Sequence, residues 1–204
     1  MEQDRILKKS FELFMRYGIR SVTMDDIARE LGISKKTLYQ TVDNKADLIE
    51  KLMRQHMQEE KEAMEDIRSR ATDAIDEMLQ IGSFVIERVS EITPGTIYDL
   101  QKYYQSLWRR MKKEMQEHVY GTIIDNLQRG IEQGLYRKEL EPEIVALLYV
   151  GKSLLVTDEE TMEICSGDME KVHRELIRYH AYGITSARGR QLLEKHLLAQ
   201  EKLR

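Results

Sequence analysis

Apolar residues recur every three or four positions along most of the chain, which places them on one face of an α-helix. Thr93-Pro94 predicts the start of a helix that breaks within residues 102–107, and Gly134 suits the end of the next one. The other long stretches with this spacing are residues 3–17, 45–66, 71–90, 142–157, 169–184 and 187–202. With two shorter helices near the N-terminus, the pattern predicts an all-α fold of nine or ten helices.

One stretch predicts these two short helices, separated by a glycine. Thr23 followed by Asp26 is typical of a capping box, in which two side chains bind the free N–H groups at a helix start. Gly32 suits the left-handed end of that helix, and Ser34 can cap a second helix over about residues 35–41. Two short helices joined by a glycine-containing turn indicate a helix-turn-helix.

The second short helix has an apolar side and a polar side. Leu38 and Val42, four residues apart, would anchor it to a core and leave the polar side outside. There, lysines can neutralise phosphates, hydroxyls can donate to phosphate oxygens, and Gln40 can pair with an adenine edge in the major groove. The residues predicted to contact DNA are Thr23, Ser34, Lys35, Lys36, Thr37, Tyr39 and Gln40.

A longer motif carries a family resemblance. The run TMDDIARELGISKKTLY, followed by NKADLI, resembles the DNA-binding domain of the tetracycline-repressor (TetR) family of bacterial transcription regulators, over roughly residues 5–52. The resemblance implies a homodimer on a palindromic operator of double-stranded DNA, with Lys45 contacting a phosphate. It also implies a small-molecule cavity in a larger helical domain.

One departure from the family pattern keeps other functions open. Many members have a Y-x-x-F ending after the Leu-Tyr pair, whereas this chain has Gln40-Thr41-Val42. Valine fills less volume than phenylalanine, and Gln40 alters the base-reading surface. The alternatives are a DNA-binding protein without effector control and a helical protein-interaction module that has lost DNA binding.

Charge is divided unequally along the chain. Residues 1–54 hold 11 Lys+Arg and 9 Asp+Glu, a balance of +2, whereas the remainder has a balance of −6. Since an acidic portion repels DNA, only the N-terminal part is expected to touch it. The sequence therefore predicts a DNA-binding domain over residues 1–55 and a helical effector-binding and dimerisation domain over residues 56–204.

Other classes of protein have little support. No run approaches 18 apolar residues, the N-terminus has no apolar signal core, and Cys165 is the single cysteine. These features favour a cytoplasmic location without membrane association. The chain has no glycine-rich phosphate loop, nucleophile elbow or zinc helix, so we expect no enzyme, no cofactor and no metal site.

Aromatic residues and methionines are concentrated in the middle of the chain. At helical spacing they form either a packed core or an effector pocket, because Tyr and Trp keep a polar tip and Met adapts to varied apolar ligands. The candidates for ligand contact are Phe84, Tyr98, Tyr104, Trp108, Met111, Met115 and Tyr120. The ligand itself is not identified by these residues.

The last third of the chain is the predicted dimer interface. Its helices carry apolar stripes, and in the family such C-terminal helices pack as a four-helix bundle across a two-fold axis. The candidates for contact are Gly151, Leu155, Leu176, Tyr179 and Leu193. We expect a homodimeric regulator, a repressor that a small-molecule effector releases from DNA.

Overall fold

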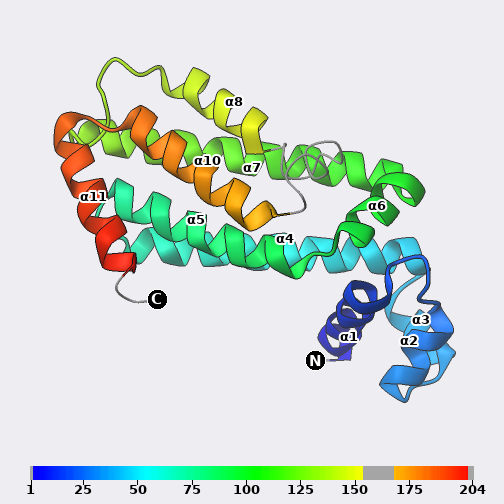
Figure 1. The fold of residues 1–204 in the computed structure, drawn as a ribbon. Coiled ribbons are helices and arrows are strands. Elements are labelled where there is room, and N and C mark those ends of the chain that lie inside the picture. The colour runs from blue at the N-terminus through cyan, green and yellow to red at the C-terminus, as the bar shows by residue number, and fades with distance from the viewer. Residues whose placement is uncertain (1, 154–167, 202–204) are drawn as a thin grey trace. The chain divides into compact units, whose positions relative to one another are not determined.

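The computed structural model describes residues 2–153 and 168–201, which form ten α-helices and no named strand (Figure 1). The all-α prediction and the number of helices are confirmed. The helices are α1 (Glu2–Tyr17), α2 (Met24–Leu31), α3 (Lys35–Thr41), α4 (Lys45–Arg70), α5 (Ala74–Glu91), α6 (Pro94–Tyr103), α7 (Gln105–Glu132), α8 (Pro142–Ser153), α10 (Met169–Ile184) and α11 (Ala187–Glu201).

Most helix ends follow from local residue choices. The predicted break within residues 102–107 occurs at Tyr104, between α6 and α7. Gly134, with φ of 68°, lies in the left-handed region just beyond α7. The predicted end of α8 near residue 157 lies outside the described residues. None of the described helices has the length and apolar character required to cross a membrane.

The chain divides into two compact units. The first consists of Met1–Ala63 with Glu91–Lys113, and the second of Met64–Ser90 with Glu114–Arg204. This division is based on how the residues pack. The predicted boundary near residue 55 instead separates a DNA-binding part from an effector-binding and dimerisation part, and it stays a prediction.

The first unit has one apolar core that includes the three N-terminal helices, the start of α4, α6 and the start of α7. Ile6, Ile27, Leu38 and Leu48 are fully buried in it. Leu100 and the beginning of α7 belong to the same cluster. A segment nearly 100 residues from the N-terminus therefore completes the core beneath the helix-turn-helix.

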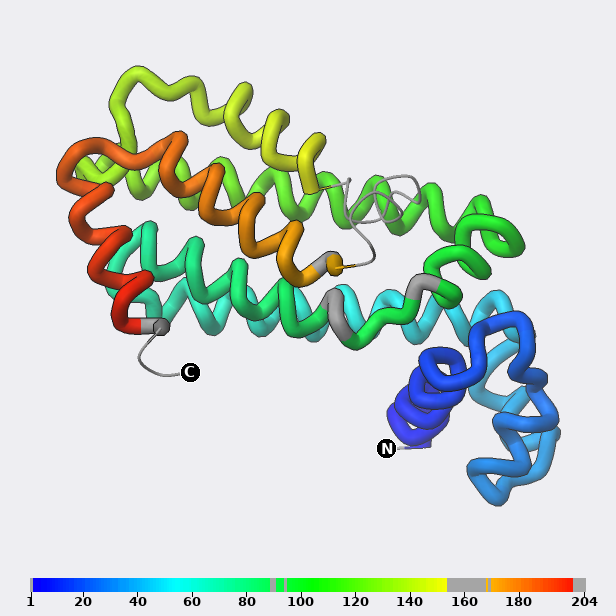
Figure 2. The backbone as a smooth tube through the Cα atoms, viewed as in Figure 1, coloured from blue at the N-terminus to red at the C-terminus, as the bar shows by residue number. Residues whose placement is uncertain are grey.

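The second unit contains the end of α4, nearly all of α5, most of α7, and α8, α10 and α11, and α8 and α10 run side by side in it (Figure 2). The segment after α7 is tied to the turn between α10 and α11. There the Arg137 N–H donates to the Ile184 carbonyl at 2.9 Å, and the Ser186 N–H donates to the Leu135 carbonyl at 2.9 Å. These bonds flank an isolated antiparallel bridge between Tyr136 and Thr185.

A buried polar cluster joins α5 to α7 in the second unit. The Glu77 carboxylate, 2% exposed, pairs with Arg129 and accepts a hydrogen bond from the Asn126 amide at 2.6 Å. The Tyr136 hydroxyl lies 2.9 Å from the Ala74 carbonyl and 2.8 Å from the Asn126 side-chain oxygen. Burial raises the pKa of Tyr136 above its ordinary value, so the hydroxyl keeps its proton and acts as a donor.

Candidate nucleic-acid interface

The first helix of the predicted motif, α2, is capped at both ends by local hydrogen bonds. The Asp26 N–H donates to the Thr23 hydroxyl oxygen at 3.2 Å, and the Thr23 N–H donates to the Asp26 carboxylate at 2.9 Å. Gly32, with φ of 65°, turns the chain, and the Ile33 N–H then donates to the Ala28 carbonyl at 3.0 Å. The predicted capping box and glycine stop are confirmed.

The second helix, α3, is held by one cap and two apolar anchors. The Thr37 N–H donates to the Ser34 hydroxyl oxygen at 3.0 Å, which starts the helix. Leu38 is 0% exposed, and Val42, at the helix end, is 1% exposed. The smaller Val42, which departs from the family pattern, is therefore buried in the core of this unit.

The outward side of α3 carries Lys35, Lys36, Tyr39 and Gln40, and all four are exposed. Lys36, Tyr39 and Gln40 form no side-chain hydrogen bond to any other residue in the described ranges, so their polar groups are open to solvent. Lys35 instead pairs with Asp25 of α2 at 2.6 Å. Both partners are more than half exposed, and such surface pairs contribute roughly 0–1 kcal/mol, so a phosphate can replace Asp25 at little cost.

Three of the residues predicted to contact DNA have hydroxyls that already form hydrogen bonds at a helix start. The Thr23 hydroxyl donates to Asp26 at 2.6 Å, and the hydroxyls of Ser34 and Thr37 bond to each other at 2.8 Å. Hydrogen bonds from Thr23 hold the pKa of Asp26 below its ordinary value, so this acceptor stays ionised. A phosphate contact by Thr23 would have to compete with this capping box.

Lys45, for which a phosphate contact is predicted, has a structural role at the start of α4. Its ammonium donates to the backbone carbonyls of Ile19 and Val22, in the loop between α1 and α2. Burial lowers the pKa of Lys45, and the nearby charge of Asp99 opposes that shift. Two of the three ammonium hydrogens are thereby occupied, which leaves one for a phosphate.

Arg20, which the sequence analysis did not select, lies in the same loop. It is exposed and precedes the capping box of α2 by three residues. The sequence signal was present, as a basic residue close to a predicted helix-turn-helix, but its partners come from residues 99 and 103. Only tertiary packing brings these residues to the loop.

The seven candidates for ligand contact are divided between the two units. Met111 is buried in the core of the first unit, and Tyr104 and Trp108 pack against that core. Tyr98 belongs to the first unit and is 42% exposed. Phe84, Met115 and Tyr120 belong to the second unit. The candidates in the first unit therefore lie either in or against its packed core or, for Tyr98, at its surface.

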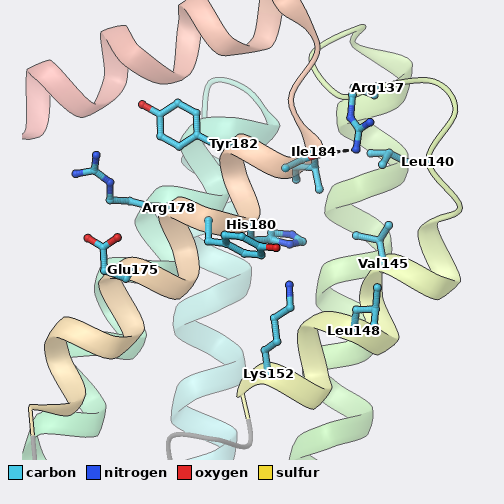
Figure 3. A pocket seen from close by; sticks show the side chains of 12 residues that line it. Arg137, Leu140, Val145, Leu148, Lys152, Glu175, Arg178, His180, Tyr182 and Ile184 are labelled. Atoms are coloured by element: carbon cyan, nitrogen blue, oxygen red, sulfur yellow. Dashed lines mark hydrogen bonds between the residues drawn. The ribbon is translucent and has the colours of Figure 1, made fainter. Parts of the chain in front are cut away.

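A pocket does occur in the second unit, between α8 and α10, and none of the seven candidates lines it (Figure 3). It is open to solvent and has a volume of about 630 Å³. Its walls combine apolar side chains with charged ones. They are Arg137, Leu140, Val145, Leu148, Lys152, Glu175, Arg178, Tyr179, His180, Tyr182, Gly183 and Ile184.

His180 is the most enclosed titratable group of this pocket. Its ring meets that of Tyr149 edge-on at 4.7 Å between centroids, and its exposed fraction is 6%. Burial, with a further contribution from the positive charge of Lys152, lowers the pKa of His180 to about 4. The imidazole is therefore neutral at pH 7.

The predicted dimer contacts have different surroundings. Tyr179 is 70% exposed, Gly151 is exposed, and Leu176 is partly buried. Leu193 is 0% exposed in the core of the second unit, so its side chain has no surface for a partner, and we remove it from the predicted interface. Leu155 lies outside the described residues.

With this geometry in place, the N-terminal motif can be compared with known proteins. Residues 6–52 match the family described as bacterial regulatory proteins, tetR family. The chain belongs to the TetR family. As a member of that family it is a transcriptional regulator with a helix-turn-helix DNA-binding motif.

Relatives extend the similarity beyond the motif. The "uncharacterized HTH-type transcriptional regulator YvaF" of Bacillus subtilis (strain 168) is 27% identical over 157 residues, which are 76% of this chain and 81% of that protein. The fatty acid degradation regulator FadR of Bacillus halodurans has a TM-score of 0.68 at 17% identity, with 88% of this chain and 94% of that chain covered.

A regulator from Saccharomonospora viridis, in complex with choline, has a TM-score of 0.60 at 17% identity over 91% of this chain and 98% of that chain. At such low identity, these two structures show that the fold is shared.

Proposed function

We propose that this TetR-family protein is a homodimeric repressor that binds a palindromic operator and is released by a small-molecule effector. In this proposal residues 1–55 bind DNA, and residues 56–204 dimerise and bind the effector. The observation that carries the proposal is the outward side of α3, where two lysines, a tyrosine and a glutamine lie over apolar anchors. A helix of this kind fits a major groove.

On DNA, the exposed groups of α3 would divide into two kinds. Lys36 and Lys35 neutralise phosphates, the latter after exchanging Asp25 for a phosphate oxygen, and Tyr39 donates its hydroxyl. Gln40 has both a donor and an acceptor on its amide, so it can pair with an adenine edge. Phosphate contacts set the position of the helix, and the Gln40 contact reads sequence.

Dimerisation is supported by apolar side chains that α8 and α10 leave in solvent. Ile144, Leu147 and Leu148 are each more than half exposed, and so is Tyr179 on α10. Leu148 and Tyr179 also line the pocket of Figure 3, so a second copy packed on these helices would cover the mouth of that pocket. Two recognition helices on one operator also provide the contact area that a single α3 lacks.

Effector control is supported by the choline complex of the Saccharomonospora viridis regulator, which has the same fold. In this chain, Phe84, Met115 and Tyr120 are the candidate contacts that lie in the second unit. An effector that favours the released state would weaken operator binding about 5–150-fold, which is the usual range of allosteric coupling. DNA must weaken effector binding by the same factor.

The test is a titration of purified protein with promoter DNA from near its own coding region, at several salt concentrations. We expect binding whose affinity falls steeply as salt rises, because each phosphate contact releases counterions. The control is a duplex of unrelated sequence, which should bind more weakly. If neither promoter DNA nor operator sequences selected from a random library bind in a salt-dependent way, the protein is not a DNA-binding regulator of this kind.

A further inference from the structure

One face of α6 is bonded to the end of α1 and to the loop that follows it. Thr96, Asp99 and Tyr103 recur at helical spacing, so their side chains share this face. The Thr96 hydroxyl, in a residue 2% exposed, lies 3.4 Å from the Phe14 carbonyl. All of these residues belong to the first compact unit, together with the helix-turn-helix.

Asp99 and Tyr103 both bind the same loop residue. The backbone N–H of Arg20 donates to the Asp99 carboxylate at 2.8 Å. The guanidinium of Arg20 donates to the Tyr103 hydroxyl at 2.8 Å, and it lies 5.0 Å from the centre of the Tyr103 ring. One residue of the loop is thus held through its backbone and its side chain at once.

The same loop is also held from α4. The Lys45 ammonium donates to the carbonyls of Ile19 and Val22, on either side of Arg20. Residues 18–22, the α1–α2 loop, therefore have backbone groups bound both to α6 and to α4. This loop leads directly into Thr23, which starts α2, so its position determines where the helix-turn-helix begins.

We propose that Asp99 and Tyr103 are positioning residues for DNA binding, which act by holding the α1–α2 loop through Arg20. The inference rests on the proposed DNA-binding function and assigns to it two residues outside the N-terminal motif. Without the Asp99 carboxylate, the Arg20 N–H returns to water, and the loop keeps only its side-chain bond to Tyr103 and its backbone bonds to Lys45. The start of α2 then samples more positions. This added mobility lowers the affinity for DNA, because the contacts of α3 depend on one docking geometry.

The experiment compares operator affinity among four variants of the full chain. The operator is first selected from a random-sequence library with the wild-type protein. Asp99→Ala removes the acceptor, Asp99→Asn keeps an oxygen acceptor without the charge, and Tyr103→Phe removes only the hydroxyl. Asp125→Ala is the matched control, because Asp125 accepts from Arg68 at 2.8 Å in the second unit.

For Asp99→Ala we expect about a tenfold loss of affinity, for Tyr103→Phe about threefold, and for Asp99→Asn and Asp125→Ala a change within about twofold. Hydrogen exchange of the Arg20 amide, followed by NMR, is the second readout. A general loss of stability would speed exchange at many amides, whereas loss of the Asp99 contact should act on the Arg20 amide in particular. That amide should exchange faster in Asp99→Ala and at the wild-type rate in Asp125→Ala.

The outcomes separate the two hypotheses. If the wild-type protein selects no operator, the proposed function fails before any variant is compared. If wild type binds and Asp99→Ala binds equally well with unchanged exchange at Arg20, the positioning role is overturned. Equal losses in Asp99→Asn and Asp99→Ala also overturn it. Should Asp99→Ala not fold, Tyr103→Phe decides, since wild-type affinity in that variant contradicts the proposal.

Discussion

At the scale of single residues, the outward groups of α3 differ in the kind of contact they can make. Lys36 can offer only a positive charge with rotating donors, whereas the Gln40 amide has a donor and an acceptor in a fixed plane. A charge attracts any phosphate, while a planar donor–acceptor pair matches one base edge. In the proposed DNA complex, the two residues would therefore contribute to different properties.

Substitution of these two residues should separate affinity from specificity. Lys36→Ala is expected to weaken binding to all sequences alike and to reduce the salt slope by about 1. Gln40→Ala should lower discrimination at one base pair by about 1–3 kcal/mol and leave the salt slope unchanged. Fluorescence anisotropy with the operator and its single-base variants, at several salt concentrations, measures both effects. Identical behaviour of the two variants would argue against α3 as the recognition helix.

His180 predicts a pH dependence of stability. Its pKa is about 4 in the folded chain and about 6.5 when unfolded, so the unfolded chain binds a proton first as pH falls. The stability that neutral His180 contributes is therefore complete above about pH 6.5 and is lost as the pH falls toward 4. The difference in pKa corresponds to about 3 kcal/mol.

The measurement is urea unfolding at a series of pH values, for wild type and for His180→Gln, which cannot take up a proton. Wild type should lose about 3 kcal/mol more than the variant between pH 7 and pH 4. Other groups titrate in both proteins and cancel in the comparison. Parallel pH profiles would show that His180 is not the buried neutral group described here.

At the scale of elements, α7 contains two glycines in different surroundings. A Cβ added at Gly130 would lie 2.0 Å from the ring of Tyr136, whereas a Cβ at Gly121 would meet no atom within 4 Å. The Tyr136 ring cannot move aside easily, because its hydroxyl is bonded within the buried polar cluster. The absence of a side chain at Gly130 therefore allows the segment after α7 to fold back onto the helix.

This contrast predicts opposite effects of the same substitution within one helix. Gly130→Ala should destabilise the protein by about 3 kcal/mol, because a buried ring must shift. Gly121→Ala should stabilise it by about 0.5–1 kcal/mol, since alanine favours a helix interior over glycine. Chemical denaturation of the two variants measures both changes. Equal stability of the two variants would contradict the packing around Tyr136.

At the scale of the whole molecule, the proposed function depends most on dimerisation. The exposed apolar residues of α8 provide the surface, and a charge placed there would be buried without a partner when two copies meet. Leu147, 61% exposed, can be substituted without disturbing the core of its own chain. A change at this residue therefore tests assembly separately from folding.

Leu147→Glu should convert the proposed dimer to a monomer at micromolar concentration and abolish operator-level affinity, with the helical content unchanged. The matched control is Leu198→Glu on α11, where the leucine is 58% exposed and lies outside the proposed interface. Light scattering gives the mass, and circular dichroism gives the helical content. A wild-type protein with the mass of a monomer, or a dimeric Leu147→Glu variant, would refute the proposed interface.

The helix-turn-helix was predictable in detail because its bonds span only a few residues. The caps at Thr23 and Ser34 connect residues three positions apart, and the glycine stop depends on one backbone conformation. The family motif adds the function of this segment, and the match over residues 6–52 agrees with it. Local chemistry of this kind is contained in the sequence itself.

The tertiary structure alone decided which surfaces the apolar stripes meet. Helical spacing showed that Trp108 and Met111 share an apolar face, but not that this face packs in the core of the first unit. In the same way, Leu193 belonged to an apolar stripe that turned out to be internal. The bonds from Arg20 to Asp99 and Tyr103 join residues 79 and 83 positions apart. Periodicity defines one face of a helix, whereas the partner of that face depends on how distant segments pack together.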